Sequence, residues 1–144
     1  MLFNTVERNV HCDEVTTRVD AGVGAGKIRL WTSDGGTLLA ELPMDATNAF
    51  TASGAQGSLG IGSQPATTGL AWLNAPLSVT DPTPVAGGVC GFVEFTDSDN
   101  NRRWAATPGL IGSGAGLELS TLTIDTGVAV TASNGQINFP AGAL

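Results

Sequence analysis

The chain has 144 residues, a length that fits one domain with a core of ordinary size. Only 13% of the residues are charged and 20 are Gly, so the sequence is rich in turns and poor in solvated charge. The net charge of -7, with six scattered Lys and Arg, argues against nucleic-acid binding, because neutralising phosphates needs clustered basic residues. No apolar run approaches about 18 residues and the N-terminus does not resemble a signal peptide, so we expect a protein that is made and kept in a cytosol, or assembled from one, and no membrane partner.

Residues 1–22 are expected to form an N-terminal arm and one helix, over residues 4–22. Four valines recur at spacings of four or five residues: Val6, Val10, Val15 and Val19. Gly22 suits the left-handed position that ends a helix. Because β-branched residues weaken this helix, it must pack on a sheet or on a neighbouring subunit. The remainder, residues 23–144, is expected to form a single β-sandwich domain.

The glycines of residues 22–27 resemble a phosphate-binding loop only superficially. A Walker loop needs a glycine where Ala21 stands and Ser or Thr where Ile28 stands, so these glycines form a connector. Two alternating segments follow, residues 27–32 and 36–42. The Asp34-Gly35 turn between them predicts a hairpin.

The middle of the chain has the weakest secondary-structure pattern. Residues 45–70 can form short strands or a long loop, and residues 57–62 form at best a short edge strand. Residues 71–73 and 76–80 indicate another strand, and residues 81–84 a stiff turn.

Residues 88–107 form the best-bounded unit of the sequence. Residues 89–95 alternate as in a strand, residues 97–101 are turn formers, and Arg103-Trp104-Ala105 begins a second strand, so the unit predicts a β-hairpin.

The C-terminal third contains a second glycine-rich segment, residues 112–116. A dinucleotide-binding loop would have to open a helix, but residues 117–124 alternate as one strand. A strand at residues 128–131, a tight turn at Asn134-Gly135 and a returning strand at residues 136–139 complete the chain. About eight regularly spaced strands predict an all-β fold, a β-sandwich or jelly-roll-like domain.

Few residues carry the chemistry of a catalytic or metal site. His11 is the only histidine, which leaves a Ser-His-Asp triad or a His-rich metal site without candidates. Cys12 and Cys90 are far apart in sequence and are expected to be free, buried thiols. We therefore assign no catalytic, cofactor-binding or metal-ligating residue and expect that the chain is not an enzyme.

Two binding alternatives stay open. Asp97, Asp99 and Asn101 have the spacing that begins some calcium loops, although Arg102 follows where an EF-hand has Gly, and a hairpin tip explains the same residues. The three tryptophans could form a sugar-stacking platform or serve as core anchors. They are Trp31, Trp72 and Trp104.

Short segments spread over nearly the whole chain form an ordered pattern. They are residues 18–22 (RVDAG), 24–31 (GAGKIRLW), 37–42 (TLLAEL), 49–50 (AF), 69–72 (GLAW), 95–99 (FTDSD), 112–115 (GSGA) and 137–142 (INFPAG). In this order they resemble a family of small virion proteins encoded in the structural modules of tailed bacteriophages. The sequence departs from the pattern in a Pro-rich insertion, residues 76–84.

This resemblance implies a virion structural protein, most simply a capsid decoration or cement protein on the outer capsid surface. The implied partners are the major capsid protein and other copies of the chain, as a homotrimer or another small ring. Residues 1–5 and 45–69 are then expected to be arms that order on contact. A tail or head-to-tail connector component is the first alternative, and a carbohydrate- or calcium-binding β-sandwich module is the second.

Overall fold

The computed structural model describes residues 26–43, 61–63, 70–73 and 79–138, together with Val10, His11, Glu14, Arg18 and Val19. Twelve strands lie in this part of the chain: β1 (Lys27–Trp31), β2 (Leu38–Pro43), β3 (Ile61–Ser63), β4 (Leu70–Leu73), β5 (Val79–Asp81), β6 (Gly88–Val89), β7 (Phe92–Thr96), β8 (Arg102–Ala106), β9 (Pro108–Leu110), β10 (Leu117–Leu119), β11 (Thr123–Ile124) and β12 (Val130–Asn138). The expected all-β class is confirmed.

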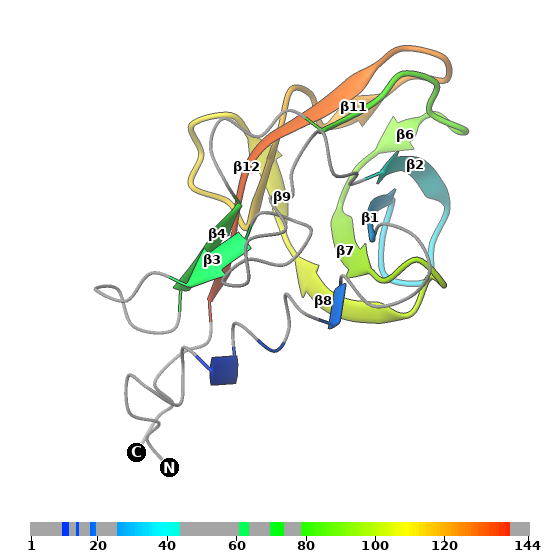
Figure 1. The fold of residues 1–144 in the computed structure, drawn as a ribbon. Coiled ribbons are helices and arrows are strands. Elements are labelled where there is room, and N and C mark those ends of the chain that lie inside the picture. Colours follow the sequence, from blue (N-terminus) through cyan, green and yellow to red (C-terminus); the bar gives the residue numbers. More distant parts are fainter. Residues whose placement is uncertain are drawn as a thin grey trace.

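The strands form two main sheets and one small ribbon (Figure 1). One sheet has the order β2-β1-β7-β8. The other has the order β3-β4-β12-β10-β9, and β5 also pairs with β12. The ribbon pairs β6 with β11. All pairings are antiparallel except that of β9 with β10.

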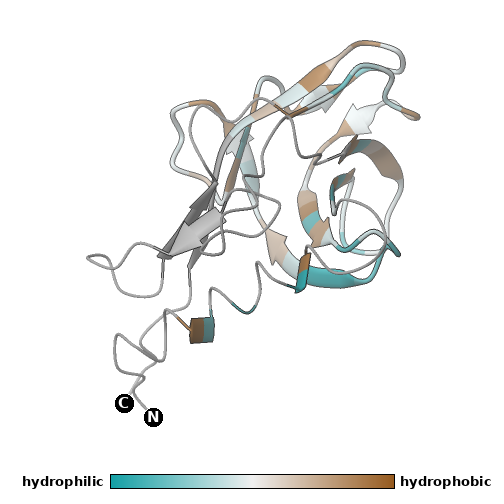
Figure 2. Ribbon diagram, viewed as in Figure 1, coloured by the Kyte–Doolittle hydropathy of each residue, from teal (hydrophilic) through white to brown (hydrophobic). Residues whose placement is uncertain are grey.

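The two main sheets share one core, as in a β-sandwich. In β1, Ile28 and Leu30 are fully buried and lie opposite Phe95 and Val93 of β7. From the other sheet, the buried residues of this core are Val79, Leu117, Leu119, Val130 and Ala132. Figure 2 shows apolar and polar residues alternating most clearly along β7. Because each large apolar side chain that leaves water contributes about 1.5–3 kcal/mol, this core is the main source of stability.

Both hairpins predicted in the first sheet are confirmed. β1 and β2 pair antiparallel, and Gly35 at their turn has a φ of 73°. β7 and β8 also pair antiparallel, and the Asp97 turn joins them. In this turn the N–H of Asn100 donates to the carbonyl of Asp97 at 3.1 Å, and Asn100 has a φ of 66°.

The single strand expected over residues 89–95 is divided between two sheets. It separates into β6 and β7 because the two residues between them bond to different neighbours. The N–H of Cys90 donates to Leu122 at 2.8 Å, and the N–H of Gly91 donates to Trp31 at 3.0 Å. The strand expected over residues 117–124 is likewise divided, into β10 and β11.

The hairpin expected at Asn134-Gly135 is wrong, because both residues lie inside the nine-residue strand β12. They pair with Glu118 and Leu117 of β10. On its other edge β12 pairs first with β5 and then with β4. Pairing along both edges keeps the backbone extended and overrides the local turn preference of Asn-Gly.

The expected N-terminal helix lies mostly outside the described residues. The five residues that are described there have helical conformation, and Arg18 forms an ion pair with Glu14 one turn earlier. Val19 is fully buried and belongs to the core. Gly26 makes room for it, because a Cβ at Gly26 would lie 2.5 Å from the carbonyl oxygen of Val19.

Candidate functional site

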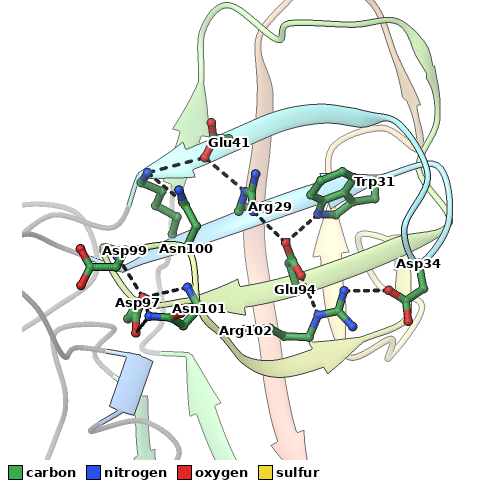
Figure 3. Close-up of polar contacts among 11 residues, drawn as sticks. Arg29, Trp31, Asp34, Glu41, Glu94, Asp97, Asp99, Asn100, Asn101 and Arg102 are labelled. Atoms are coloured by element: carbon green, nitrogen blue, oxygen red, sulfur yellow. Dashed lines mark hydrogen bonds and ion pairs between the residues drawn. The ribbon is translucent and has the colours of Figure 1, made fainter.

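Charged side chains of alternating sign cover the outer face of the β2-β1-β7-β8 sheet (Figure 3). We call this set the charged face: Lys27, Arg29, Asp34, Glu41, Glu94 and Arg102. The chain of ion pairs crosses all four strands, since Glu41 lies on β2, Arg29 on β1, Glu94 on β7 and Arg102 on β8. No sequence expectation included this network. The alternation Lys27-Ile28-Arg29, opposite acidic residues in partner strands, is the pattern that could have indicated it.

Glu94 is the centre of the charged face. Its side chain is only 5% exposed. One carboxylate oxygen accepts from Arg29 at 3.1 Å and from the indole N–H of Trp31 at 2.9 Å, and the other accepts from Arg102 at 2.6 Å. Because both oxygens are occupied by cationic or indole donors, Glu94 is a structural cross-link of three strands and offers no oxygen to a metal or substrate.

Arg102 continues the network to the first hairpin turn. Its guanidinium donates to Asp34 at 2.7 Å. Hydrogen bonds to Asp34 and then to Glu94 raise the pKa of Arg102, and the bond from Arg102 lowers the pKa of Asp34. These shifts mean that the charged forms are the stable ones in the folded protein.

The tryptophans do not converge on a sugar-binding platform in the described part. Trp31 lies on the charged face, where the guanidinium of Arg29 stands 4.9 Å from its ring centre. Trp104 instead packs against the core. Since Arg29 covers a face of the Trp31 ring and Trp104 packs against the core, these two rings do not form one stacking surface. The side chain of Trp72 lies outside the described residues.

The Asp97 turn holds its own carboxylate tightly. Asp97 accepts the backbone N–H groups of Asp99 and Asn101 at 2.9 Å each, and the side-chain amide of Asn101. Arg103 donates to the same carboxylate at 2.8 Å. Burial raises the pKa of Asp97, but the bonds from Asn101, Arg103 and Asp99 more than reverse this and lower the pKa to about 2. The calcium-like spacing is therefore explained by an Asx-type turn closed by a guanidinium, which occupies the place of a cation.

The second glycine-rich segment also surrounds a carboxylate of the chain itself. We call residues 111–116 the glycine loop. Glu118 is 5% exposed and accepts the N–H of Gly114 at 2.7 Å and that of Gly112 at 3.1 Å. Gly112 and Gly114 have φ values of 88° and 75°. The amides that a nucleotide phosphate would need are thus used by Glu118, and a strand follows the loop in place of the helix that a dinucleotide site requires.

Of the remaining candidate residues, the two cysteines and His11, only Cys90 and His11 lie among the described residues. Cys90 is buried and free, as expected, and burial raises the pKa of its thiol. Cys12 lies outside the described residues. His11 is half-buried, and the neighbours that would join it in a ligand cluster are not described. In the described ranges no three His, Cys, Asp or Glu side chains are grouped closely enough to bind a metal ion.

Apart from Val10, large apolar side chains of the described residues are exposed at two places, both away from the charged face. The first, which we call the valine surface, surrounds the β6–β11 ribbon and consists of Val85, Val89 and Val128, each about 60% exposed. The N–H of Gly127 donates to the carbonyl of Pro84 and so places these segments side by side. The second is formed by Leu110 and Ile111, which are 51% and 61% exposed at the end of β9. Figure 1 shows the ribbon and the end of β9 apart from each other.

Among the described residues, no helix has the length and hydropathy of a membrane span. No protein-family model matches this sequence, and no curated protein or solved structure is similar enough to count as a match.

Proposed function

We propose that the chain is a virion structural protein of a tailed bacteriophage, and within that class a capsid decoration protein that bridges subunits of the major capsid protein. The ordered resemblance of its segments to that family motivates the class. The observation that carries the proposal is the distribution of charge and apolar surface in the fold. The charged face is neutralised by its own ion pairs, whereas exposed apolar side chains of the described sheets lie away from that face.

This distribution suits a protein that is held by contacts. A decoration protein must bury surface against shell subunits, and the central part of such an interface is depleted of charge. We assign the valine surface to the capsid contact, because Val89 on β6 and Val85 and Val128 in the segments beside the ribbon are all exposed. Exposed apolar groups of this kind in a soluble domain indicate an interaction surface.

Cross-linking mass spectrometry on purified particles tests the capsid placement. Lys27 is the only lysine and is ion-paired, so the reagent must link carboxylates, of which the chain has 13. We expect links from exposed acidic residues such as Asp125 to the major capsid protein. Links to tail proteins alone would contradict the proposal and favour the tail or connector alternative. The number of copies per particle separates these as well, since a decoration protein occurs in hundreds and a connector in about a dozen.

Rebinding of the purified protein to particles that lack it tests the assigned surface. Val128→Asp places a charge in the valine surface and is expected to lower occupancy at least tenfold. Asn100→Asp adds the same charge at an exposed position in the Asp97 turn, at the other end of β7 from the ribbon, and is expected to bind normally. Equal binding of both variants would remove the valine surface from the proposal.

A further inference from the structure

The strand β9 forms one edge of the larger sheet, and its backbone groups alternate between the two sides. The carbonyl of Thr107 accepts the N–H of Leu117 at 3.3 Å, and the N–H of Ile111 donates to the carbonyl of Leu119 at 3.3 Å. Thr107, Gly109 and Ile111 therefore face β10. The residues between them, Pro108 and Leu110, direct their backbone groups away from the sheet.

Only two of these outward groups are available for bonding. Pro108 has no N–H, and the carbonyl of Leu110 already accepts the N–H of Ser113 at 3.0 Å. What is left is the carbonyl of Pro108 and the N–H of Leu110. Within the described residues neither has a hydrogen-bond partner.

These two groups complement each other across a two-fold axis. When two β9 strands lie antiparallel with their Gly109 residues opposite, Leu110 of each copy faces Pro108 of the other. The N–H of each Leu110 can then donate to the carbonyl of the opposite Pro108. The second bond of a regular pair would need the N–H of Pro108 and a free carbonyl on Leu110, and neither exists, so no group in the pair is left without a partner.

A foreign strand does not fit this edge equally well. An ordinary strand presents both an N–H and a carbonyl at each paired residue, and opposite Pro108 its carbonyl would find no donor. The strand that matches a proline and a capped carbonyl is a second copy of β9.

Charge favours the same occupant. No charged residue occurs from residue 104 to residue 117, and the next one, Glu118, has its carboxylate inside the glycine loop. A basic partner would be attracted to the acidic surface of a chain of charge -7, whereas an equally acidic molecule can approach only where charge is missing. Leu110 and Ile111 supply apolar area at this place.

We infer that β9 pairs with β9 of a second copy, antiparallel and around a two-fold axis at Gly109, which joins two six-stranded sheets into one. The glycine loop begins directly after Leu110, so the two-fold pairing closes as a dimer and does not propagate. The contact belongs to the purified chain and does not depend on the capsid role.

Sedimentation velocity over a range of concentrations tests the dimer. The paired segment is short, so we expect a monomer–dimer equilibrium with a Kd on the order of 0.1 mM. Leu110→Lys places two ammonium groups at the axis and is expected to raise the Kd at least tenfold. Val128→Lys is the matched control, because it makes a similar change at a similarly exposed site and should leave the Kd unchanged. A chain that stays monomeric, forms a closed trimer, or is dissociated by the control alone overturns the inference.

Cysteine pairing tests the register. In the proposed dimer Thr107 lies opposite Ile111 in a non-hydrogen-bonded pair, where side chains are closest. In a Cys12→Ser background, Thr107→Cys and Ile111→Cys proteins should form a disulfide-linked dimer when they are mixed. Thr107→Cys mixed with Val128→Cys should form at least tenfold less. Equal yields would exclude this register.

These measurements and particle rebinding can fail separately. A protein that dimerises through β9 but does not bind particles contradicts the capsid role alone. A protein that binds particles but never pairs through β9 contradicts this inference alone.

Discussion

The charged face and the β9 edge, both parts of sheets in the same small domain, differ in the groups that surround their buried carboxylates. On the charged face, Glu94 is buried under two arginines and a tryptophan. At the β9 edge the carboxylate of Glu118 is enclosed by the amides of the glycine loop, and Leu110 and Ile111 expose apolar surface. Both regions bury a carboxylate, but only the first surrounds it with cations from neighbouring strands.

The difference indicates separate roles. Ion pairs that cross four strands fix the register of a sheet, because a shift by one residue would place each charge on the core side. Their charges are already paired, which leaves little electrostatic attraction for a partner. The β9 edge makes no such cross-links and exposes Leu110 and Ile111. We therefore expect substitutions in the charged face to change stability, and substitutions at the edge to change association.

The largest effect is expected from Glu94→Ala. Removing this carboxylate leaves Arg29 and Arg102 without their shared partner, and breaking a buried pair costs about 3–5 kcal/mol. We expect about 3 kcal/mol, at the lower end, because Arg102 is 42% exposed. Urea denaturation measures the free energy of unfolding.

Asp34→Ala is the matched control for this prediction. It also removes a carboxylate bound to Arg102, but Asp34 is 63% exposed. The expected cost is several-fold smaller than that of Glu94→Ala, because exposed ion pairs contribute little. Similar costs for the two variants would show that Glu94 does not hold the sheet together as proposed.

The next effect tests the packing that holds the glycine loop. A Cβ at Gly109 would lie 2.4 Å from Ser113 Oγ and 2.5 Å from the Cβ of Ala115. Gly109→Ala must therefore displace the loop, and we expect a cost of about 1–3 kcal/mol. The control is Gly87→Ala, where the nearest atom is 3.5 Å away. If both variants unfold at the same urea concentration, the loop is not held by this close contact.

The parts of this fold that can be predicted from the sequence are those in which a strand pairs with its neighbour along the chain. Alternation and turn formers identify the β1–β2 and β7–β8 hairpins, because each is a local unit with its own turn chemistry. The hairpin predicted at Asn134-Gly135 does not form, because strands distant in sequence pair along both edges of β12. The parallel pairing of β9 with β10 across the glycine loop is equally non-local, since parallel neighbours usually need a connection of about a dozen residues or more.

The surfaces were harder to predict than the strands. The residue pattern predicts the Asp97 turn, but its closure by Arg103 depends on where β8 begins after the turn. The charged face and the exposed β9 edge depend on strand order, which alternation does not specify. Trp31 and Trp104 lie on opposite sides of their sheet, so they cannot both contribute to the sugar-stacking platform that the sequence left open.

A smaller effect concerns acid stability at the tip of the β7–β8 hairpin. The pKa of Asp97 falls from 3.8 to about 2 on folding, so its carboxylate stabilises the native state fully above about pH 4. That stabilisation is lost as the pH falls through about 2. Asp97→Asn should cost about 1 kcal/mol at neutral pH, since the hydrogen bonds to a charged group are weakened. The difference between wild type and variant, measured by urea denaturation from pH 5 to pH 2, should shrink with acid. A constant difference would contradict the lowered pKa.

The smallest change in monomer stability is expected from substitution of Leu110, the residue whose substitution should weaken dimerisation most. Leu110→Lys and Val128→Lys both change side chains that are more than half exposed, so each should alter the free energy of unfolding of the monomer by less than about 0.5 kcal/mol. A dimer that forms only from native chains nevertheless raises the melting temperature as protein concentration rises. We expect this dependence in the wild type and in Val128→Lys, and its loss in Leu110→Lys, as measured by calorimetry at low and high concentration. If Leu110→Lys lowered the melting temperature equally at every concentration, Leu110 would belong to the folding core, and the separation of a stabilising charged face from an associating edge would not hold.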